Sequence, residues 1–406
     1  MVFHSSLHLA LVALCAFVIT FAHSSPTSLI RHPPHLASSL TPVTVQSNRL
    51  ARLKPRDNDG YPDFIKDWVY WKRLHEYHEK SSGFSDHDAP DMKDIPEATL
   101  HPPGGKYSYK EQDSKKEWTV TLTTVLGSGS EGSVYKGKYE TSDDSGDAAI
   151  KKGWTSDIIK GALVQEKIRN AAIKGGNVKG SESVAEVKSY FQNTGKSFAV
   201  MQLASGDLLD LLQNTQLEGR WVVNECFHDM LEGLKAAQAA GYAHQDLKIE
   251  NFLYVIDKKG AISCLISDFG TATSQTMIKY VGGTPGFMDQ EIMRIPEDLK
   301  PAPHDPKSAD VFGMGMIYVL LAHEEMQDAD RHYRLWRDLV DKGDAPPAEI
   351  EEVLTSHVHC INGLISEMLS NVLCSQKVGR LSLEMFIRWF EDVVDTLKEE
   401  EEAHNG

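Results

Sequence analysis

The sequence predicts an α+β protein of two lobes with a cleft between them. From residue 118, "EWTVTLTTVLGSGSEGSVYKGKYE" alternates β-branched and polar residues around a glycine cluster, which predicts strand, tight loop, strand. Further along, "RWVVNECFHDMLEGLKAAQAAG" and "DVFGMGMIYVLLAHEE" are long apolar or amphipathic runs typical of helices. A β-rich first part followed by a larger α-rich part folds as two lobes around a cleft. The chain of 406 residues, 41% hydrophobic, is long enough to form both.

Between these segments, the pattern predicts a strand ending in "DAAIKK", a helix over 156–172 and a short apolar strand, "SFAVMQLA". The composition excludes a wholly disordered or fibrous protein. The net charge of -16 would repel a phosphate backbone, so we expect no nucleic-acid partner. The acidic run 399–402 is expected to be the solvated end of a C-terminal helix.

The N-terminus has the pattern of a secretory signal peptide over residues 1–24. An apolar run at 7–22 is followed by small residues, with Ala22 and Ser24 before a cleavage point near Ser25. The start lacks the usual Lys or Arg, and an uncleaved membrane anchor or a misassigned start are the alternatives. The run is short for a bilayer span, which favours cleavage and leaves no stable transmembrane segment afterwards.

The remaining domain boundaries follow from changes in composition. Residues 25–60, rich in Pro, Ser, His and Arg, predict a disordered leader or propeptide. Residues 61–80 predict one amphipathic helix with aromatic and aliphatic side chains on one face, and 81–117 a polar linker. The main domain is expected over 118–397 and an acidic tail over 398–406.

Four cysteines follow the predicted signal peptide, at positions 226, 264, 360 and 374. They are scattered, without a CxxC pair or a dense framework. This spacing favours buried free thiols over disulfides or metal ligands.

The glycine cluster "GSGSEGSV" is the first motif that carries chemistry. Gly127, Gly129 and Gly132 allow backbone N–H groups to approach phosphates without obstruction by a Cβ. A dinucleotide site would require a helix directly after the glycines, and here a strand follows.

Three further motifs follow in order. "AAIK" places Lys151 on a strand that faces the cleft, and Glu166 follows on a helix as its expected ion-pair partner. "HQDLKIEN" supplies the carboxylate of Asp246 and, five residues on, the amide of Asn251, and "SDFG" supplies Asp268. Carboxylate and amide oxygens are hard ligands that suit Mg²⁺.

These four motifs resemble those of the eukaryotic protein kinase family over about 118–397. The resemblance implies a bilobal kinase fold, bound ATP and Mg²⁺, and transfer of the γ-phosphoryl group to a protein hydroxyl. Lys248 in "DLK" and Thr284 in "GTP" resemble the members that act on Ser/Thr. The expected partners are therefore protein substrates with Ser/Thr acceptors.

The resemblance also assigns site residues. It implies catalytic or positioning roles for Asp246, Lys248, Lys151 and Glu166, and metal binding by Asn251 and Asp268. It places Met201 as gatekeeper, the backbone of Gln202 and Leu203 at adenine, and Asp207 near the ribose. The nucleotide-binding positions are Leu126, Gly127, Ser128, Gly129, Ser130, Glu131, Gly132, Val134, Ala149, Lys151, Met201, Gln202, Leu203, Asp207 and Leu253.

Structural matches and departures accompany these assignments. Glu291 is expected to pair with Arg380, and Asp310 to brace the catalytic loop. The departures are Gln245 where the family has Arg, "DQE" where it has APE, an extended stretch over 292–309, and polar Asn170 where an apolar residue usually packs against the DFG Phe. A neutral Gln cannot pair with an activation-loop phosphate as Arg does.

The sequence therefore predicts a Ser/Thr protein kinase that enters the secretory pathway. A pseudokinase acting as a scaffold or binding module is the alternative. Because a kinase requires ATP, the expected destinations are the ER or Golgi lumen, or the cytoplasm of another cell after export.

Overall fold

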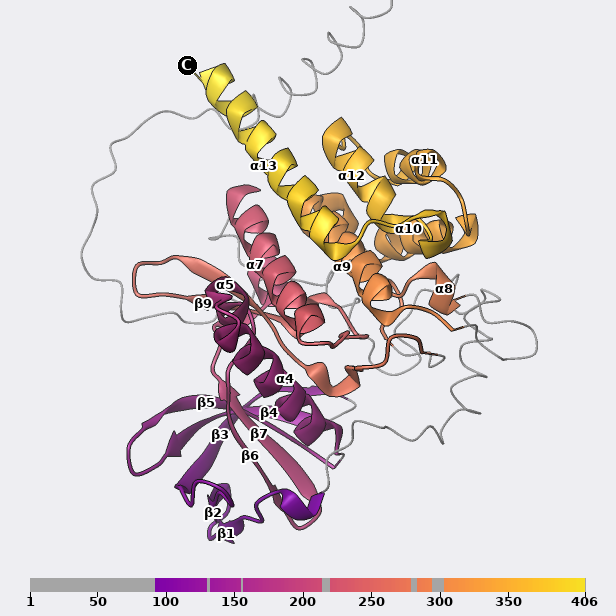
Figure 1. The fold of residues 1–406 in the computed structure, drawn as a ribbon. Helices are drawn as coiled ribbons and strands as arrows, with labels where there is room; N and C mark the ends of the chain where they lie inside the picture. The colour runs from indigo at the N-terminus through magenta and orange to yellow at the C-terminus, as the bar shows by residue number, and fades with distance from the viewer. Residues whose placement is uncertain are drawn as a thin grey trace, which may run out of the picture.

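The computed structural model describes residues 92–129, 132–154, 156–213, 220–278, 283–293 and 303–405. It confirms the two-lobed α+β fold, with a curled sheet in the N-terminal lobe and mainly helices in the C-terminal lobe (Figure 1). The predicted signal peptide, leader and amphipathic helix, residues 1–80, lie outside the described residues.

A seven-stranded antiparallel sheet forms the N-terminal lobe, in the order β1-β2-β3-β4-β5-β7-β6. Its hydrophobic core is mostly aromatic, and the rings of Phe191 and Phe198 stack with centroids 4.5 Å apart. The strands are β1 Thr99–His101, β2 Lys106–Lys110, β3 Glu117–Gly129, β4 Gly132–Glu140, β5 Ser145–Gly153, β6 Val187–Asn193 and β7 Lys196–Gln202.

The predicted linker over 81–117 is only partly a linker. Its described part carries the 3-10 helix η2 (Met92–Asp94) and strands β1 and β2. Tyr107 and Tyr109 of β2 are buried against Phe191, which explains why this polar segment joins the sheet. Its alternation of apolar and polar residues is too short to stand out in the sequence.

Helices dominate the C-terminal lobe, where strands β8–β10 form a small sheet. Helix α4 (Asp157–Lys174) lies beside the N-terminal sheet, and α5 (Val178–Glu182) packs against α4 and α7. The other elements are β8 Gly206–Asp207, α6 Leu208–Gln213, α7 Arg220–Ala239, η4 Ile249–Asn251, β9 Phe252–Ile256, β10 Ile262–Ile266, η5 Phe269–Thr271, α8 Gln290–Met293, α9 Pro306–Ala322, η6 Glu324–Gln327, α10 Ala329–Lys342, α11 Pro347–His357, α12 Gly363–Leu373, η7 Gln376–Val378 and α13 Leu383–Asn405.

Helix α9 is the centre of this lobe. Its first residue is Pro306, and the Asp305 side chain caps it by accepting a hydrogen bond from the Lys307 N–H. Every residue from 310 to 321 is buried, and α9 contacts both α7 and α12. A helix that is apolar on all sides lies inside the protein. The sequence predicted a helix here.

The prediction of free thiols is wrong for one pair of cysteines. Cys226 of α7 and Cys264 of β10 form a disulfide, with Cα atoms 5.0 Å apart. Cys374 is buried and free, and Cys360 is exposed. The two bonded cysteines are 38 residues apart in sequence, so only the packing of α7 on β10 brings them together.

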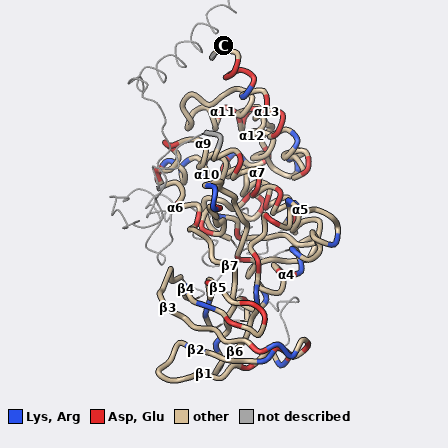
Figure 2. The backbone as a smooth tube through the Cα atoms, turned by 90° about the vertical axis from the view of Figure 1, so that its left-hand side faces the viewer, with Lys and Arg blue, Asp and Glu red and all other residues tan. Residues whose placement is uncertain are grey.

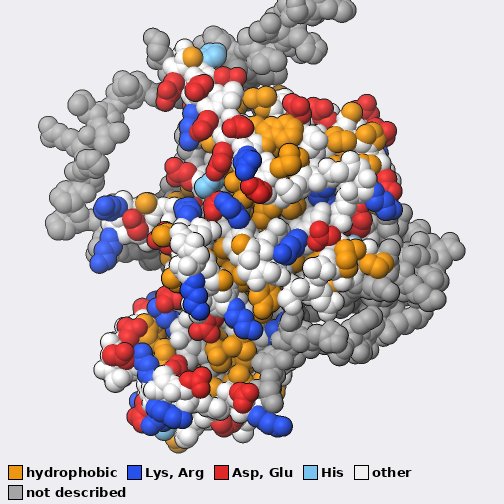
Figure 3. Space-filling model, viewed as in Figure 1, with side chains coloured by type: hydrophobic (Ala, Val, Ile, Leu, Met, Phe, Trp, Pro, Cys, Tyr) orange, Lys and Arg blue, Asp and Glu red, His pale blue; other side chains and the backbone are white. Residues whose placement is uncertain are grey.

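Charge is distributed unevenly over the described surface. Acidic side chains cluster at the end of α13, where 399–402 are exposed, as predicted (Figure 2). On the face in Figure 3, charges of both signs are interspersed, and hydrophobic side chains reach the surface near α12. None of the described helices combines the length and apolarity that a membrane span requires.

Candidate active site

A cavity of about 480 Å³ lies between the two lobes. It is enclosed by β3, β4, β5 and β7 on one side and by β8, β9 and the segment before η5 on the other. The predicted nucleotide and metal residues that line it are Leu126, Gly127, Val134, Ala149, Lys151, Met201, Gln202, Leu203, Asp207, Asn251, Leu253 and Asp268. Apolar walls with a few charged groups at one end are typical of a nucleotide site.

The glycine-rich hairpin connects the end of β3 to the start of β4. Ser128 pairs with Ser133 across the hairpin, and Gly129 pairs with Gly132. Gly132 has a φ of 148°, and a Cβ there would collide with the Lys152 carbonyl, so glycine is required. Ser128, Gly129 and Gly132 do not line the cavity, and the predicted positions 130 and 131 lie outside the described residues.

Lys151 forms an ion pair with Asp268, with 2.7 Å between Nζ and Oδ1. Burial raises the pKa of Asp268, but Lys151 outweighs this effect and holds the pKa below its ordinary value. Asp268 has a φ of 64°, a left-handed backbone conformation that is uncommon for residues other than glycine. Such backbone strain persists where the surroundings fix it, commonly at functional sites.

The predicted partner of Lys151 is not in place. No Lys151–Glu166 ion pair occurs among the described residues; burial and the nearby carboxylate of Glu111 raise the pKa of Glu166. Gln165 lines the cleft instead. Neighbouring helical residues point about 100° apart, so the rotation of α4 about its axis decides which one faces the cleft.

Close packing against η5 sets the position of α4. A Cβ on Gly161 would lie 2.9 Å from the Gly270 backbone nitrogen, so glycine permits the contact. Phe269 is fully buried in a core that includes Ile168 of α4. Asn170 is exposed, so it does not occupy the position against Phe269 that the sequence assigned to it.

Asp310 braces the catalytic loop as predicted. Its carboxylate accepts hydrogen bonds from the backbone N–H groups of His244 (2.6 Å) and Gln245 (2.9 Å). Burial raises the pKa of Asp310 to about 7, while these donors act in the opposite direction. Gln245 has a φ of 71°, and its side-chain amide donates to the Pro306 carbonyl at 2.9 Å.

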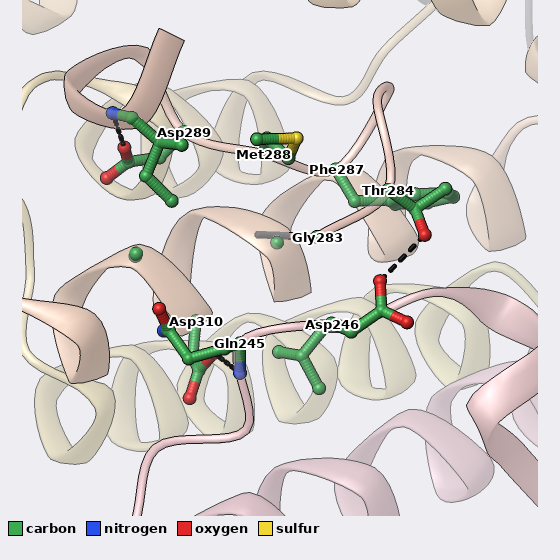
Figure 4. Close-up of a pocket in the computed structure, with 12 residues that line it drawn as sticks. Gln245, Asp246, Gly283, Thr284, Phe287, Met288, Asp289 and Asp310 are labelled. Carbon is green, nitrogen blue, oxygen red and sulfur yellow. Dashed lines mark hydrogen bonds between the residues drawn. The ribbon is translucent and has the colours of Figure 1, made fainter. Parts of the chain in front are cut away.

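Asp246 lies at the centre of a polar cluster beside the cleft. Its carboxylate accepts a hydrogen bond from Lys248 Nζ at 2.5 Å. It accepts a second from Thr284 Oγ1 at 2.7 Å (Figure 4). Asn251 Nδ2 donates to the Asp246 backbone carbonyl at 2.7 Å. The loop thus places Asp246, Lys248 and Asn251 together, with Thr284 contributed by a segment 38 residues away in sequence.

The "DQE" sequence forms the ion pair predicted for Glu291. Arg380 Nη2 lies 3.3 Å from Glu291, and its Nη1 lies 2.7 Å from Asp289. Burial raises the pKa of Asp289, but Arg380 outweighs it and lowers the pKa below its ordinary value. The role of Asp289 was not predicted from the sequence, although an acidic residue two positions before Glu291 is a visible signal.

A family model described as "Protein kinase domain" matches residues 120–389. The chain belongs to the protein kinase family. Its similarity to curated kinases is partial, and the chain spans about half or less of the length of the relatives it matches.

Testis-specific serine/threonine-protein kinase 3 of Mus musculus is 32% identical over 155 residues, covering 35% of this chain and 52% of the relative. CBL-interacting serine/threonine-protein kinase 8 of Arabidopsis thaliana is 27% identical over 199 residues, covering 47% and 42%. Mitogen-activated protein kinase kinase kinase 1 of Arabidopsis thaliana is 28% identical over 219 residues, covering 52% and 34%.

Proposed function

We propose that this kinase-family chain transfers the γ-phosphoryl group of ATP to Ser/Thr hydroxyls of protein substrates. The ion pair between Lys151 and Asp268 carries the proposal, because it joins residues 117 positions apart at the charged end of the interlobe cavity. Asp246 and Lys248 lie on the adjoining loop. The similarity to serine/threonine kinases supports the choice of acceptor.

The residues present fit a magnesium nucleotide. Asn251 uses its Nδ2 to hold the catalytic loop, which leaves its Oδ1 for a metal ion. Asp268 uses Oδ1 for Lys151, and its side chain keeps 33% of its surface exposed. Mg²⁺ is commonly bound by one or two protein oxygens together with phosphates and water.

Each side chain then has a defined task. Bound Mg²⁺ and ATP would supply the electrophilic γ-phosphoryl group and screen its charge. Asp246 would accept the hydrogen bond of the incoming hydroxyl, orient its oxygen for attack and take its proton. Lys248, already within hydrogen-bond distance of Asp246, would neutralise negative charge on the transferring group. Lys151 would hold the phosphates at the other end.

Turnover of ATP on a degenerate Ser/Thr peptide library tests this proposal. Lys151→Ala and Asp246→Ala should each lower turnover by at least about 100-fold, because each removes a group that acts in the transition state. Lys258→Ala changes an exposed lysine and should leave turnover unchanged. Equal, negligible turnover by the wild type and both site variants would overturn the assignment.

A scaffold without catalysis is the second candidate, and the position of Glu166 favours it. Without the Lys151–Glu166 pair, this arrangement lacks a contact that family kinases make in their active state. If the chain is such a scaffold, it should bind protein partners equally well with and without ATP, and the turnover assay above separates the two.

We further propose that the protein enters the secretory pathway and acts in the ER or Golgi lumen, or in another cell after export. The apolar run at 7–22 and the Cys226–Cys264 disulfide support this, since disulfides persist in oxidising compartments. Localisation of a tagged full chain, with sequencing of its N-terminus, tests the proposal. Cytosolic retention with an intact N-terminus would contradict it.

A further inference from the structure

Helix α10 holds the segment that follows Thr284 with two ring N–H groups. His332 Nε2 donates to the Gly286 carbonyl at 3.1 Å, and Trp336 Nε1 donates to the Met288 carbonyl at 2.7 Å. The two residues are four positions apart, so they lie one above the other on one face of the helix. Both rings are fully buried.

The geometry of His332 indicates a dedicated donor. A carbonyl oxygen can only accept, so Nε2 carries the proton. Nδ1 has no hydrogen-bond partner in the part of the chain that the structure describes. Burial lowers the pKa of His332 to about 4, which keeps the ring neutral. Gly286 has a φ of 97°, and a Cβ there would lie 3.2 Å from His332 Nε2, so glycine permits the close approach.

The segment held by α10 ends beside the reacting group. Thr284 precedes Gly286 by two residues and donates to Asp246 Oδ1, and the Phe287 N–H donates to the Thr284 carbonyl at 3.1 Å (Figure 4). The turn over 284–287 is therefore fixed at one end by Asp246 and at the other by α10. Asp246, Thr284 and Phe287 line one pocket, so a protein hydroxyl that reaches Asp246 comes close to this turn.

We propose that His332 and Trp336 are positioning residues for the protein substrate, acting through the turn at 284–287. The proposal rests on the kinase function proposed above. Neither ring lines the nucleotide cavity, so their effect falls on peptide phosphorylation and leaves nucleotide binding unchanged.

Comparing two phosphoryl acceptors, the peptide library and water, separates a positioning role from a general loss of stability. Trp336→Phe removes the N–H and keeps the ring, His332→Leu removes the donor, and His332→Gln keeps an amide N–H. For Trp336→Phe and His332→Leu, we expect kcat/KM for the peptide library to fall about tenfold, the usual cost of one lost buried hydrogen bond. Transfer to water, measured as ATP hydrolysis, and ADP affinity should stay within twofold. His332→Gln should recover most of the peptide activity, and Asp330→Asn, exposed on the same helix, should match the wild type.

The outcomes are distinct. Suppose that the wild type is active and that folded Trp336→Phe and His332→Gln phosphorylate peptide and hydrolyse ATP in the wild-type ratio. If His332→Leu also keeps that ratio, or fails to fold, the positioning role is overturned and the kinase function stands. A parallel loss of peptide phosphorylation, ATP hydrolysis and ADP affinity would also overturn it. A wild type without turnover on any acceptor would overturn the kinase function and this proposal with it.

Discussion

Gln245 is a loop-fixing residue in this structure. Its side chain donates to the Pro306 carbonyl and its backbone N–H to Asp310, so both of its donors bind inside the C-terminal lobe. A neutral amide in this position has no charge to offer a phosphate. Under the proposed kinase function, we expect Gln245 to affect how the protein is activated, since Asp246, Lys248 and Asn251 remain in place beside it.

Activity should accordingly be independent of phosphorylation on the segment after Gly270. We expect a variant with alanine at all four hydroxyl positions, Thr271, Thr273, Ser274 and Thr276, to keep turnover within an order of magnitude. The Thr271 hydroxyl donates to the His244 carbonyl at 3.0 Å, and its loss accounts for a moderate decrease. A folded variant without measurable turnover in the peptide assay would contradict this account.

His332 should make stability depend on pH. Its pKa is about 4 in the fold and about 6.5 when unfolded. Between these values the unfolded chain binds a proton that the folded chain does not, so the free energy of unfolding falls as the pH falls from 6.5 to 4. The loss reaches about 3 kcal/mol.

Urea unfolding of the wild type and His332→Gln at pH 7 and pH 4 measures this effect. The difference between the two proteins should shift by most of that amount in favour of the variant at pH 4. Asp310 and the other acids are common to both proteins and cancel in the difference. A difference that is the same at both pH values would contradict a neutral, buried His332.

Among the secondary-structure elements, the disulfide links α7 to β10 and encloses the catalytic loop between them. Cys226 and Cys264 close a chain segment that contains Asp246, Lys248 and Asn251. Cys264 also receives support from Asp229, which accepts a hydrogen bond from its backbone N–H at 2.9 Å. The bond thus restrains α7 against the strand that leads to Asp268.

Removing the disulfide should destabilise the fold. A closed segment of 38 residues corresponds to about 4 kcal/mol in the chain-entropy model, although strain reduces this in practice. We expect Cys226→Ser with Cys264→Ser, or reduction by dithiothreitol, to lower Tm by roughly 5 to 10 °C. Intact mass with and without reduction verifies the bond. An unchanged Tm after complete reduction would contradict a stabilising role.

Rotation of an element explains why the predicted Lys151–Glu166 contact is absent among the described residues. The sequence identifies a helix after Lys151 with acidic and amide residues in its second half, and α4 confirms that helix. Whether Glu166 or Gln165 faces the cleft depends on how α4 rests on Gly270, a contact between segments 109 residues apart (270 − 161). Local periodicity carries no information on such a contact.

Over the whole molecule, the sequence predicted the parts that local patterns determine. The lobes and the glycine hairpin follow from strand alternation and helix periodicity, whereas the residues that line the cleft were implied by the resemblance to the kinase family. Three contacts could not be predicted from local patterns, because each joins distant segments through tertiary packing. They are the Cys226–Cys264 disulfide, the Asp289–Arg380 ion pair and the hydrogen bonds from α10 to residues 286–288. Strands β1 and β2 are short, and β2 differs from a linker chiefly in that Tyr107 and Tyr109 are buried against Phe191.

The central claim is that Asp246 activates a hydroxyl for phosphoryl transfer from a nucleotide held by Lys151 and Asp268. Single-turnover transfer from γ-labelled ATP to the peptide library, comparing the wild type with Asp246→Asn, tests it most directly. We predict equal ATP affinity and transfer that is 100- to 10,000-fold slower in the variant, the usual range for loss of a catalytic base. Asp392→Asn, exposed on α13, should match the wild type. Equal transfer rates for the wild type and Asp246→Asn would contradict the claim.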